Sequence, residues 1–194
     1  MNRKKTLILL GAVAAVLLIV LLLNLFPLAP EPTPEAVIRE FFTAVNARDT
    51  QKVSQLLVPG ADQSFRWPAN NLGKAIHENL NVLSVENVLG SGDSEFTADV
   101  TLETLSVRQV MSRATLLWMI SQQETDGSED QALAEIYNKI LSEKSLPKEV
   151  VFCIIKLRQE GNKLRILPDE ALESVLDGNL TENLQYIENL MNGK

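Results

Sequence analysis

The longest apolar run of the chain extends over residues 7–26 and contains no charge. About 20 mostly apolar residues suffice to cross a hydrocarbon core about 30 Å thick, so this run has the length of a transmembrane helix. Three basic residues and no acidic residue precede it, and the positive-inside rule then places the N-terminus in the cytoplasm. The pattern predicts a single-pass protein of the cell membrane with an extracellular C-terminal domain.

A cleaved signal peptide is the competing interpretation of this run. It would carry a shorter apolar region, of about 7 to 15 residues, and a small-x-small cleavage site. The nearest candidate site ends at Ala29, but Pro27 stands where a small residue is needed and Pro30 follows. A retained signal anchor in the lipid bilayer is therefore favoured. The predicted organisation is a cytoplasmic tail (1–5), a transmembrane helix (6–28), a proline-rich linker (29–34), an extracytoplasmic domain (35–178) and a C-terminal helix (179–194).

Apolar residues recur at helical spacing after the linker. They predict a first helix that starts at Pro34 with Thr33 as its N-cap, because proline suits the first helical turn. Asp49 is placed to cap a second short helix that ends before Pro59, and residues 72–80 predict a third. The apolar face of the first helix consists of Val37, Ile38, Phe41, Phe42 and Val45.

The hydrophobic period then changes from helical to alternating. Residues 82–89 and 96–105 predict a hairpin. Apolar and polar residues alternate strictly in its second strand, which predicts that one face of the hairpin is exposed to solvent. The run 149–157 is apolar at odd and even positions alike, which is typical of a central strand buried on both faces. A Gly-Asn turn joins it to a partner strand over residues 164–167, so the pattern predicts a second hairpin.

A helical pair is predicted between the two hairpins. Apolar residues at helical spacing follow Val107, and the polar loop 122–127 ends that helix. Ser128 and Gln131 suit a capping box for the second helix, and Pro147 closes the insertion. The first inserted helix carries a wide apolar stripe, assigned to the core by its spacing but also compatible with a docking surface: Met111, Leu117, Trp118 and Met119.

Two short helices are predicted to close the chain. Asp169 is placed to cap the first, which stops at Gly178, and Thr181 to cap the second. Helices, a hairpin, a helical pair, a second hairpin and closing helices together predict an α+β domain. Its antiparallel sheet is expected to carry helices on one face.

Acidic residues dominate the predicted domain. Residues 1–30 contain three of the 18 basic residues and none of the 25 acidic ones, so the rest of the chain carries 15 basic and 25 acidic residues. A nucleic-acid backbone requires clustered Lys and Arg, so this composition argues against nucleic acid as a partner. Cys153 is the only cysteine, which rules out a disulfide within the chain. In its apolar strand it is expected to be a small buried side chain.

Candidate catalytic and metal-binding residues are few. His77 is the only histidine and is expected to be solvated on its helix, and one histidine with one distant cysteine does not make a zinc site. Asp99 and Glu103 fall on the polar face of their strand, while Tyr137 and Tyr186 fall on helices outside the sheet. Because no pair of titratable groups has a plausible mutual geometry, we predict no catalytic residue, no metal site and no cofactor.

Two short polar motifs are interpreted as structural. The carboxylates of residues 124–130 lack the alternating ligand spacing of a calcium loop and predict a solvated turn. The tripeptide Asn179-Leu180-Thr181 matches a glycosylation sequon, a pattern short enough to occur by chance. Neither motif adds a candidate site.

Two stretches resemble the nuclear transport factor 2-like superfamily. Residues 41–49, Phe-Phe-Thr-Ala-Val-Asn-Ala-Arg-Asp, look like the turn between its two opening helices, and residues 156–166 are similar to its closing hairpin. More narrowly, the domain resembles the small lumazine-binding-like and uncharacterised domains of this superfamily that Gram-positive bacteria tether to the membrane. The resemblance covers most of residues 34–178, although Leu164 stands where relatives commonly place Trp in the last strand.

This resemblance implies a curved sheet wrapped by helices into a cone, often with an apolar pocket at its open end. The hydrophobic pattern is equally compatible with an open pocket and with a cone filled by its own side chains. Superfamily enzymes that move protons place an acid or base inside the cone, with a hydrogen-bonding partner. Such a role requires Asp99, Glu103 or His77 inside a closed apolar cavity.

A binding role is the function that these observations favour. We predict a noncatalytic domain that binds a protein partner or a small apolar ligand at the cell envelope. The alternative is a structural subunit of an envelope assembly, such as a secretion or conjugation machine, in which related domains oligomerise. A proton-transfer enzyme is the least favoured of the three.

Overall fold

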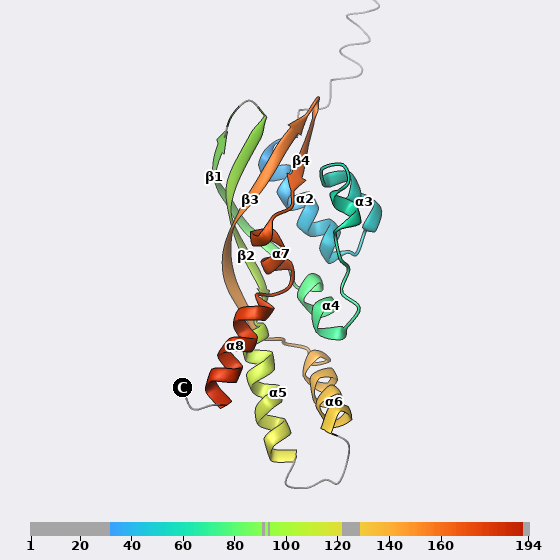
Figure 1. The fold of residues 1–194 in the computed structure, drawn as a ribbon, viewed down its shortest axis with the longest axis vertical. Helices are drawn as coiled ribbons and strands as arrows, with labels where there is room; N and C mark the ends of the chain where they lie inside the picture. Colours follow the sequence, from blue (N-terminus) through green and yellow to red (C-terminus); the bar gives the residue numbers. More distant parts are fainter. Residues whose placement is uncertain (1–31, 91, 93, 122–128, 192–194) are drawn as a thin grey trace, which may run out of the picture. The chain divides into compact units, whose positions relative to one another are not determined.

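The computed structural model describes residues 32–191, except 91, 93 and 122–128. In this part of the chain, seven α-helices and four β-strands confirm the predicted α+β order, including both hairpins and the helical pair between them (Figure 1). The predicted capping box at Ser128 and most of the acidic stretch 124–130 lie outside the described residues. The elements are α2 (Pro34–Asn46), α3 (Thr50–Leu56), α4 (Asn71–Glu78), β1 (Asn81–Gly90), β2 (Glu95–Leu105), α5 (Val107–Ser121), α6 (Glu129–Leu141), β3 (Lys148–Glu160), β4 (Lys163–Leu167), α7 (Glu170–Leu176) and α8 (Leu180–Met191).

The prediction of a single-pass membrane protein is not supported and is corrected. No helix in the described part of the chain is long and apolar enough to cross a bilayer. The longest of these helices, α5, has 15 residues and carries Arg108 and Arg113, and at 1.5 Å per residue it measures only about 22 Å. The segment 6–28, predicted to be the transmembrane helix, lies outside the described residues. The fold class of the described residues is therefore α+β with no membrane-spanning helix among them, and these residues give no support for a location in the cell membrane.

The four strands form one antiparallel sheet in the order β1-β2-β3-β4. At the β1 edge, Arg39 Nη1 donates a hydrogen bond to the Val82 carbonyl oxygen at 2.9 Å. At the β4 edge, the Val58 N–H donates to the Ile166 carbonyl oxygen at 3.0 Å. Because unpaired backbone groups at a sheet edge invite pairing with other chains, these contacts protect both edges.

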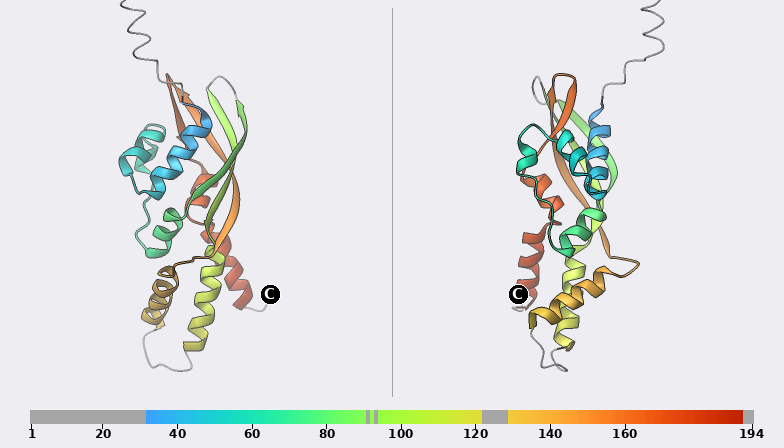
Figure 2. Two further views of the ribbon diagram at one scale, coloured as in Figure 1. Left: turned by 180° about the vertical axis from the view of Figure 1, so that it is seen from behind. Right: turned by 90° about the vertical axis from the view of Figure 1, so that its right-hand side faces the viewer.

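Helices α2, α3 and α7 pack against one face of the sheet, called the inner face below (Figures 1 and 2). Phe41 of α2, Leu102 of β2 and Leu157 of β3 are completely buried there. Phe41 also packs edge-on against Phe42 and Phe65, with 5.4 and 6.2 Å between ring centroids. The inner face is therefore packed with the side chains of the chain itself along these strands.

A second core lies among α4, α5, α6 and α8. The helical pair α5–α6 leaves the sheet between β2 and β3 and extends beyond its end (Figure 1). Val110 and Ala114 of α5 and Ile140 of α6 are buried in this core. The Ser106 N–H donates to the Pro147 carbonyl oxygen at 2.8 Å, which closes the insertion where it leaves the sheet.

Gly178 lies between α7, which packs in the inner-face core, and α8, which packs in the second core. Its φ of +65° is in the left-handed region that favours glycine. A Cβ atom at this position would lie 2.6 Å from Val107 Cγ2 and 2.9 Å from Ile76 Cδ1. A residue without a side chain is therefore required at this junction.

Local capping explains where several helices begin. Three predicted N-caps are confirmed, each accepting a hydrogen bond from the backbone N–H three residues later: Thr33, Asp49 and Asp169. The prediction that Thr181 caps the last helix is wrong, because α8 begins at Leu180. Asn179, with a φ of +51°, precedes that helix. A residue in the left-handed region redirects the chain here, which the Thr181 pattern did not indicate.

Candidate functional site

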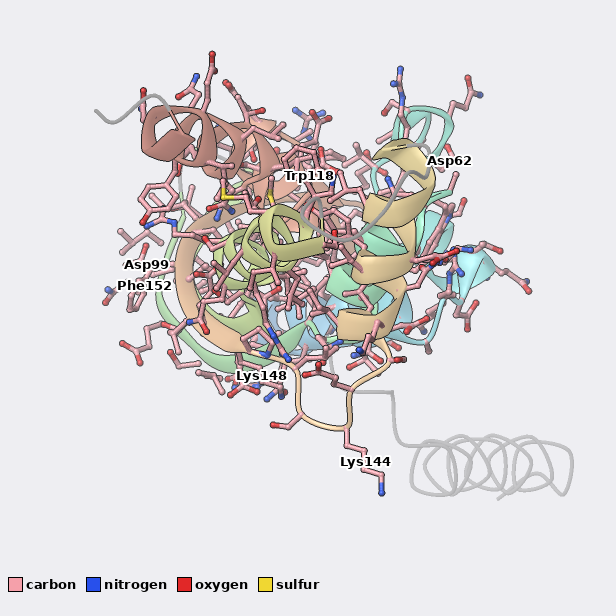
Figure 3. All side chains as sticks on the ribbon, turned by 90° about the horizontal axis from the view of Figure 1, so that it is seen from below. Asp62, Asp99, Trp118, Lys144, Lys148 and Phe152 are labelled. Carbon is pink, nitrogen blue, oxygen red and sulfur yellow. The ribbon has the colours of Figure 1, made fainter. Side chains whose placement is uncertain are left out.

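Strand β3 carries apolar side chains on both faces, but helices cover only the inner one. Successive residues of a strand point to opposite faces, and three successive outward positions of β3 are apolar: Val150, Phe152 and Ile154, which are 51%, 79% and 52% exposed. These three residues are called the outer strip. Figure 3 shows Phe152 pointing away from the sheet on the same side as Asp99 of β2. The prediction that this strand is buried on both faces is therefore wrong for its outer face.

Charged side chains flank the outer strip in two rows. Lys148 Nζ lies 2.6 Å from Glu103 Oε1 at one end of the paired strands, and Arg158 Nη2 lies 2.8 Å from Glu95 Oε1 at the other. Exposed ion pairs of this kind contribute only about 0–1 kcal/mol each to stability, so their main effect is to frame the strip with charge. The acidic row on the neighbouring β2 is Glu95, Asp99 and Glu103. The basic row on β3 continues the line of the strip beyond both of its ends with Lys148, Lys156 and Arg158, and Lys156 Nζ also lies 3.0 Å from Asp169 Oδ2.

A shallow depression of about 240 Å³ lies at the centre of the outer strip. Asp99 and Thr101 of β2 and Phe152 and Ile154 of β3 line it. Asn87 Nδ2 donates to Asp99 Oδ2 at 2.8 Å and holds that carboxylate in place. Since cavities for small molecules usually measure about 300–1,000 Å³, the depression suits one inserted side chain of a partner.

The two strand carboxylates considered as candidate acids or bases also lie on the outer face. Asp99 accepts the hydrogen bond from Asn87, and Glu103 pairs with Lys148. Asp99 is exposed and Glu103 is half-buried. Neither is enclosed in an apolar cavity, so these two residues do not form the arrangement that proton transfer in a cone requires.

His77 is buried, and the prediction that it is solvated is wrong. It is 2% exposed and packs beside Phe65 and Trp67, with 6.4 and 5.7 Å between ring centroids. Burial lowers the pKa of His77 below its ordinary 6.5, although the Asp177 carboxylate and a hydrogen bond to the Leu176 backbone oppose this shift. Its Nδ1 atom has no hydrogen-bond partner among the described residues. His77 is therefore neutral at physiological pH and withdrawn from solvent.

Cys153 and the two tyrosines do not provide an activated group. Burial, with a smaller contribution from the Asp169 carboxylate, raises the pKa of the Cys153 thiol to about 11. The nucleophilic thiolate is therefore scarce at neutral pH. Burial also raises the pKa of Tyr137 on α6, and Tyr186 on α8 lies 4.6 Å below the guanidinium carbon of Arg108. No group of His, Cys, Asp and Glu in the described part of the chain is arranged to hold a metal ion.

The apolar stripe on α5 divides between core and surface. Met111 is buried, Leu117 and Trp118 are half-buried, and Met119 is exposed. The prediction of a core stripe therefore holds for the first half of the helix and fails at its end.

A signal for the outer strip was present in the sequence. When one face of an antiparallel sheet is solvated, its strands normally alternate between apolar and polar residues. β2 does so, with Thr101 and Asp99 on the outer face, whereas β3 places Phe152 and Ile154 directly opposite them. This difference between paired strands marks an apolar site on a face whose β2 positions next to it are polar.

The comparisons with known proteins leave the family of the chain open. No protein-family model matches the chain, and no curated protein matches it. Among solved structures, the chain is similar to a SEC-C motif containing protein from Rhodopseudomonas palustris, with 14% sequence identity over 73% of this chain and 80% of that chain, and a TM-score of 0.40. That likeness is too slight to support an argument about fold or function. The resemblance to the nuclear transport factor 2-like superfamily stays a prediction.

Proposed function

We propose that this chain is a noncatalytic binding domain that docks another protein on the outer face of its sheet. The observation that carries the proposal is the 79% exposure of Phe152 in the middle of β3. Removing an aromatic side chain of this size from water stabilises a complex by about 1.5–3 kcal/mol. Val150 and Ile154 extend the apolar surface on either side, so a partner gains more by covering the whole strip.

The layout of the outer face resembles that of protein interfaces in general. Such interfaces place aromatic anchors in an apolar centre and polar or charged residues at the rim. Here Phe152 is the central aromatic residue, and the acidic and basic rows form the rim. A fitting partner has an apolar centre of its own, basic groups facing the acidic row and acidic groups facing the basic row.

The state of the titratable residues supports a noncatalytic role. His77 is neutral and withdrawn from solvent, and the pKa of Cys153 is raised to about 11. Asp99 and Glu103 are held by Asn87 and Lys148. General acid–base and nucleophilic catalysis require accessible groups with pKa values near neutral pH, and burial makes His77 and Cys153 unsuited to either role.

Photo-crosslinking in the cells that naturally produce the chain tests the proposal. Phe152 is replaced by p-benzoylphenylalanine in the full chain, and illumination is expected to yield a discrete product of higher mass. Leu184 on α8 is also an exposed apolar residue and provides the matched control position. An Ile154→Lys substitution, which places a charge in the strip, should reduce the product at position 152 at least about tenfold, since a buried unpaired charge is costly.

Two outcomes would overturn the proposal. One is the absence of a product at position 152 beyond the level at position 184. The other is a product at position 152 whose yield is unchanged by Ile154→Lys, because a specific interface would not tolerate that charge.

Assembly from copies of the chain is a second candidate function. The acidic row and the basic row lie on neighbouring strands. A two-fold axis that runs parallel to these strands would place the acidic row of one copy opposite the basic row of the other. A crosslinked product of about twice the 21.5 kDa mass of the chain, containing only this protein, would favour assembly over a different partner.

A further inference from the structure

A cavity of about 430 Å³ lies between α7 and the segment that follows the 3₁₀ helix Ala61–Gln63. Its size is within the range of about 300–1,000 Å³ that is typical of small-molecule sites. Phe65, Leu172 and Leu176 give it an apolar floor. A ligand with a small hydrocarbon body therefore has a surface to cover.

Helix α7 contributes two carboxylates to the wall of this cavity. Glu173 and Asp177 are exposed, one turn apart, and neither side chain has a hydrogen bond or an ion pair within the described residues. Like charges at this spacing repel by about 0.2–0.5 kcal/mol. Asp177 is the C-cap of α7, where the helix dipole also favours a positive charge, whereas Glu173 lies in the first turn of this helix. This wall is therefore suited to an ammonium group.

Arg66, in the segment that follows the 3₁₀ helix, contributes a positive charge to the wall of the cavity that α7 does not form. Its guanidinium group likewise has no hydrogen bond or ion pair in the part of the chain that the structure describes. The neighbouring Phe65 and Trp67 rings pack edge-on with 5.1 Å between their centroids, which fixes the backbone on both sides of Arg66. Arginine binds carboxylates through paired hydrogen bonds, so this wall is suited to a carboxylate.

We propose that this cavity binds an amino-acid-like zwitterion with an apolar side chain. The ammonium group of the ligand lies against Glu173 and Asp177, and its carboxylate pairs with Arg66. The side chain of the ligand covers Phe65 and Leu172. This site is separate from the outer strip and does not depend on the proposed docking function.

His77 supplies a reporter for occupancy of the cavity. It is the only histidine of the chain, so its imidazole resonance is identified without assignment of other histidines. The Asp177 carboxylate raises the pKa of His77 against the larger opposing effect of burial. A bound ammonium group offsets that carboxylate, so the titration of His77 moves to lower pH when the ligand binds.

Calorimetric titration of the full chain with L-leucine and L-phenylalanine tests the proposal. Phenethylamine, which lacks the carboxylate, and 3-phenylpropionate, which lacks the ammonium group, are the matched controls. L-phenylalanine is expected to bind at least about tenfold more tightly than either control, because each charged group makes a charge-assisted contact. Binding should also move the His77 titration to lower pH.

Substitutions then locate the site. Arg66→Gln and Glu173→Gln are each expected to weaken binding of L-phenylalanine at least about tenfold. Glu170→Gln, an exposed position on the same helix outside the cavity, should leave binding unchanged. The proposal is overturned if neither amino acid binds with a dissociation constant of about 10 mM or lower, which corresponds to a binding free energy of about 3 kcal/mol. The proposal is also overturned if phenethylamine or 3-phenylpropionate binds as tightly as L-phenylalanine. It is overturned as well if Glu170→Gln weakens binding as much as Glu173→Gln.

Discussion

Both faces of strand β3 carry apolar side chains, but their surroundings are opposite. On the inner face Ile155 and Leu157 are completely buried beneath helices, while on the outer face Phe152 is the most exposed large apolar residue of the described chain. Inner residues stabilise the fold because folding itself removes them from water. Outer residues gain less of this stabilisation within one chain, and their exposure is the reason for proposing that another protein covers them.

Truncation of an inner residue is expected to have the largest effect. Leu157→Ala removes a completely buried side chain and leaves a cavity, so the free energy of unfolding should fall by about 2–5 kcal/mol. Urea denaturation of the purified protein, followed by circular dichroism, measures this change. A loss below about 1 kcal/mol would mean that the inner face is not closely packed.

Thiol labelling compares adjacent residues on the two faces. Cys153 has a pKa of about 11, whereas a cysteine in water has a pKa of about 8.5, so its thiolate is about 300-fold scarcer at neutral pH. Labelling by a disulfide reagent should be at least about a hundredfold slower in the natural chain than in the double variant Phe152→Cys, Cys153→Ala. Equal rates at pH 7.4 would contradict the assignment of Cys153 to the inner face.

The pH dependence of stability tests the burial of His77. Because burial lowers the pKa of His77 in the folded protein, the unfolded state binds more protons between that value and about 6.5. The stabilising contribution is therefore present above about pH 6.5 and is lost as the pH falls toward the folded-state pKa, by at most about 1.4 kcal/mol per pH unit. His77→Gln should remove this slope in urea denaturation between pH 7.5 and 5. A slope that is the same in both proteins would show that His77 is not its source.

Substitution in the outer strip is expected to have the smallest effect on stability. Phe152→Thr keeps a residue that favours strands and removes only exposed surface, so the free energy of unfolding should change by less than about 0.5 kcal/mol. The same substitution should abolish partner binding if the outer strip is the docking site. A loss of stability comparable to that of Leu157→Ala would show that the two faces do not differ in the way proposed.

Local signals predicted most of the fold. Helical spacing after Pro34, alternation in 96–105 and the caps at Asp49 and Asp169 each depend on residues close in sequence, and the structure confirms them. Hydrophobic period specifies which residues share a face, so both hairpins and the helical pair were recognisable. The order of elements then sufficed for the α+β class and the antiparallel sheet.

The candidate sites depended on contacts between distant segments, which periodicity does not report. Apolar residues at 150, 152 and 154 identify a face of β3 but not whether a helix covers it. His77 is buried because Phe65 and Trp67, from the preceding loop, pack against it. The cavity beside α7 similarly joins Arg66 to residues more than a hundred positions away in sequence. Such arrangements follow from tertiary packing and could not be read from local pattern.

The missing side chain at Gly178 has a consequence for cooperativity. Gly178 directly follows α7, whose buried residues belong to the inner-face core, and Val107 and Ile76 of the second core leave no room beside it for even one methyl group. Two cores joined so closely cannot loosen independently, since separation of either one would open this contact. The described part of the chain is therefore expected to unfold in a single transition, with both hydrophobic clusters melting together.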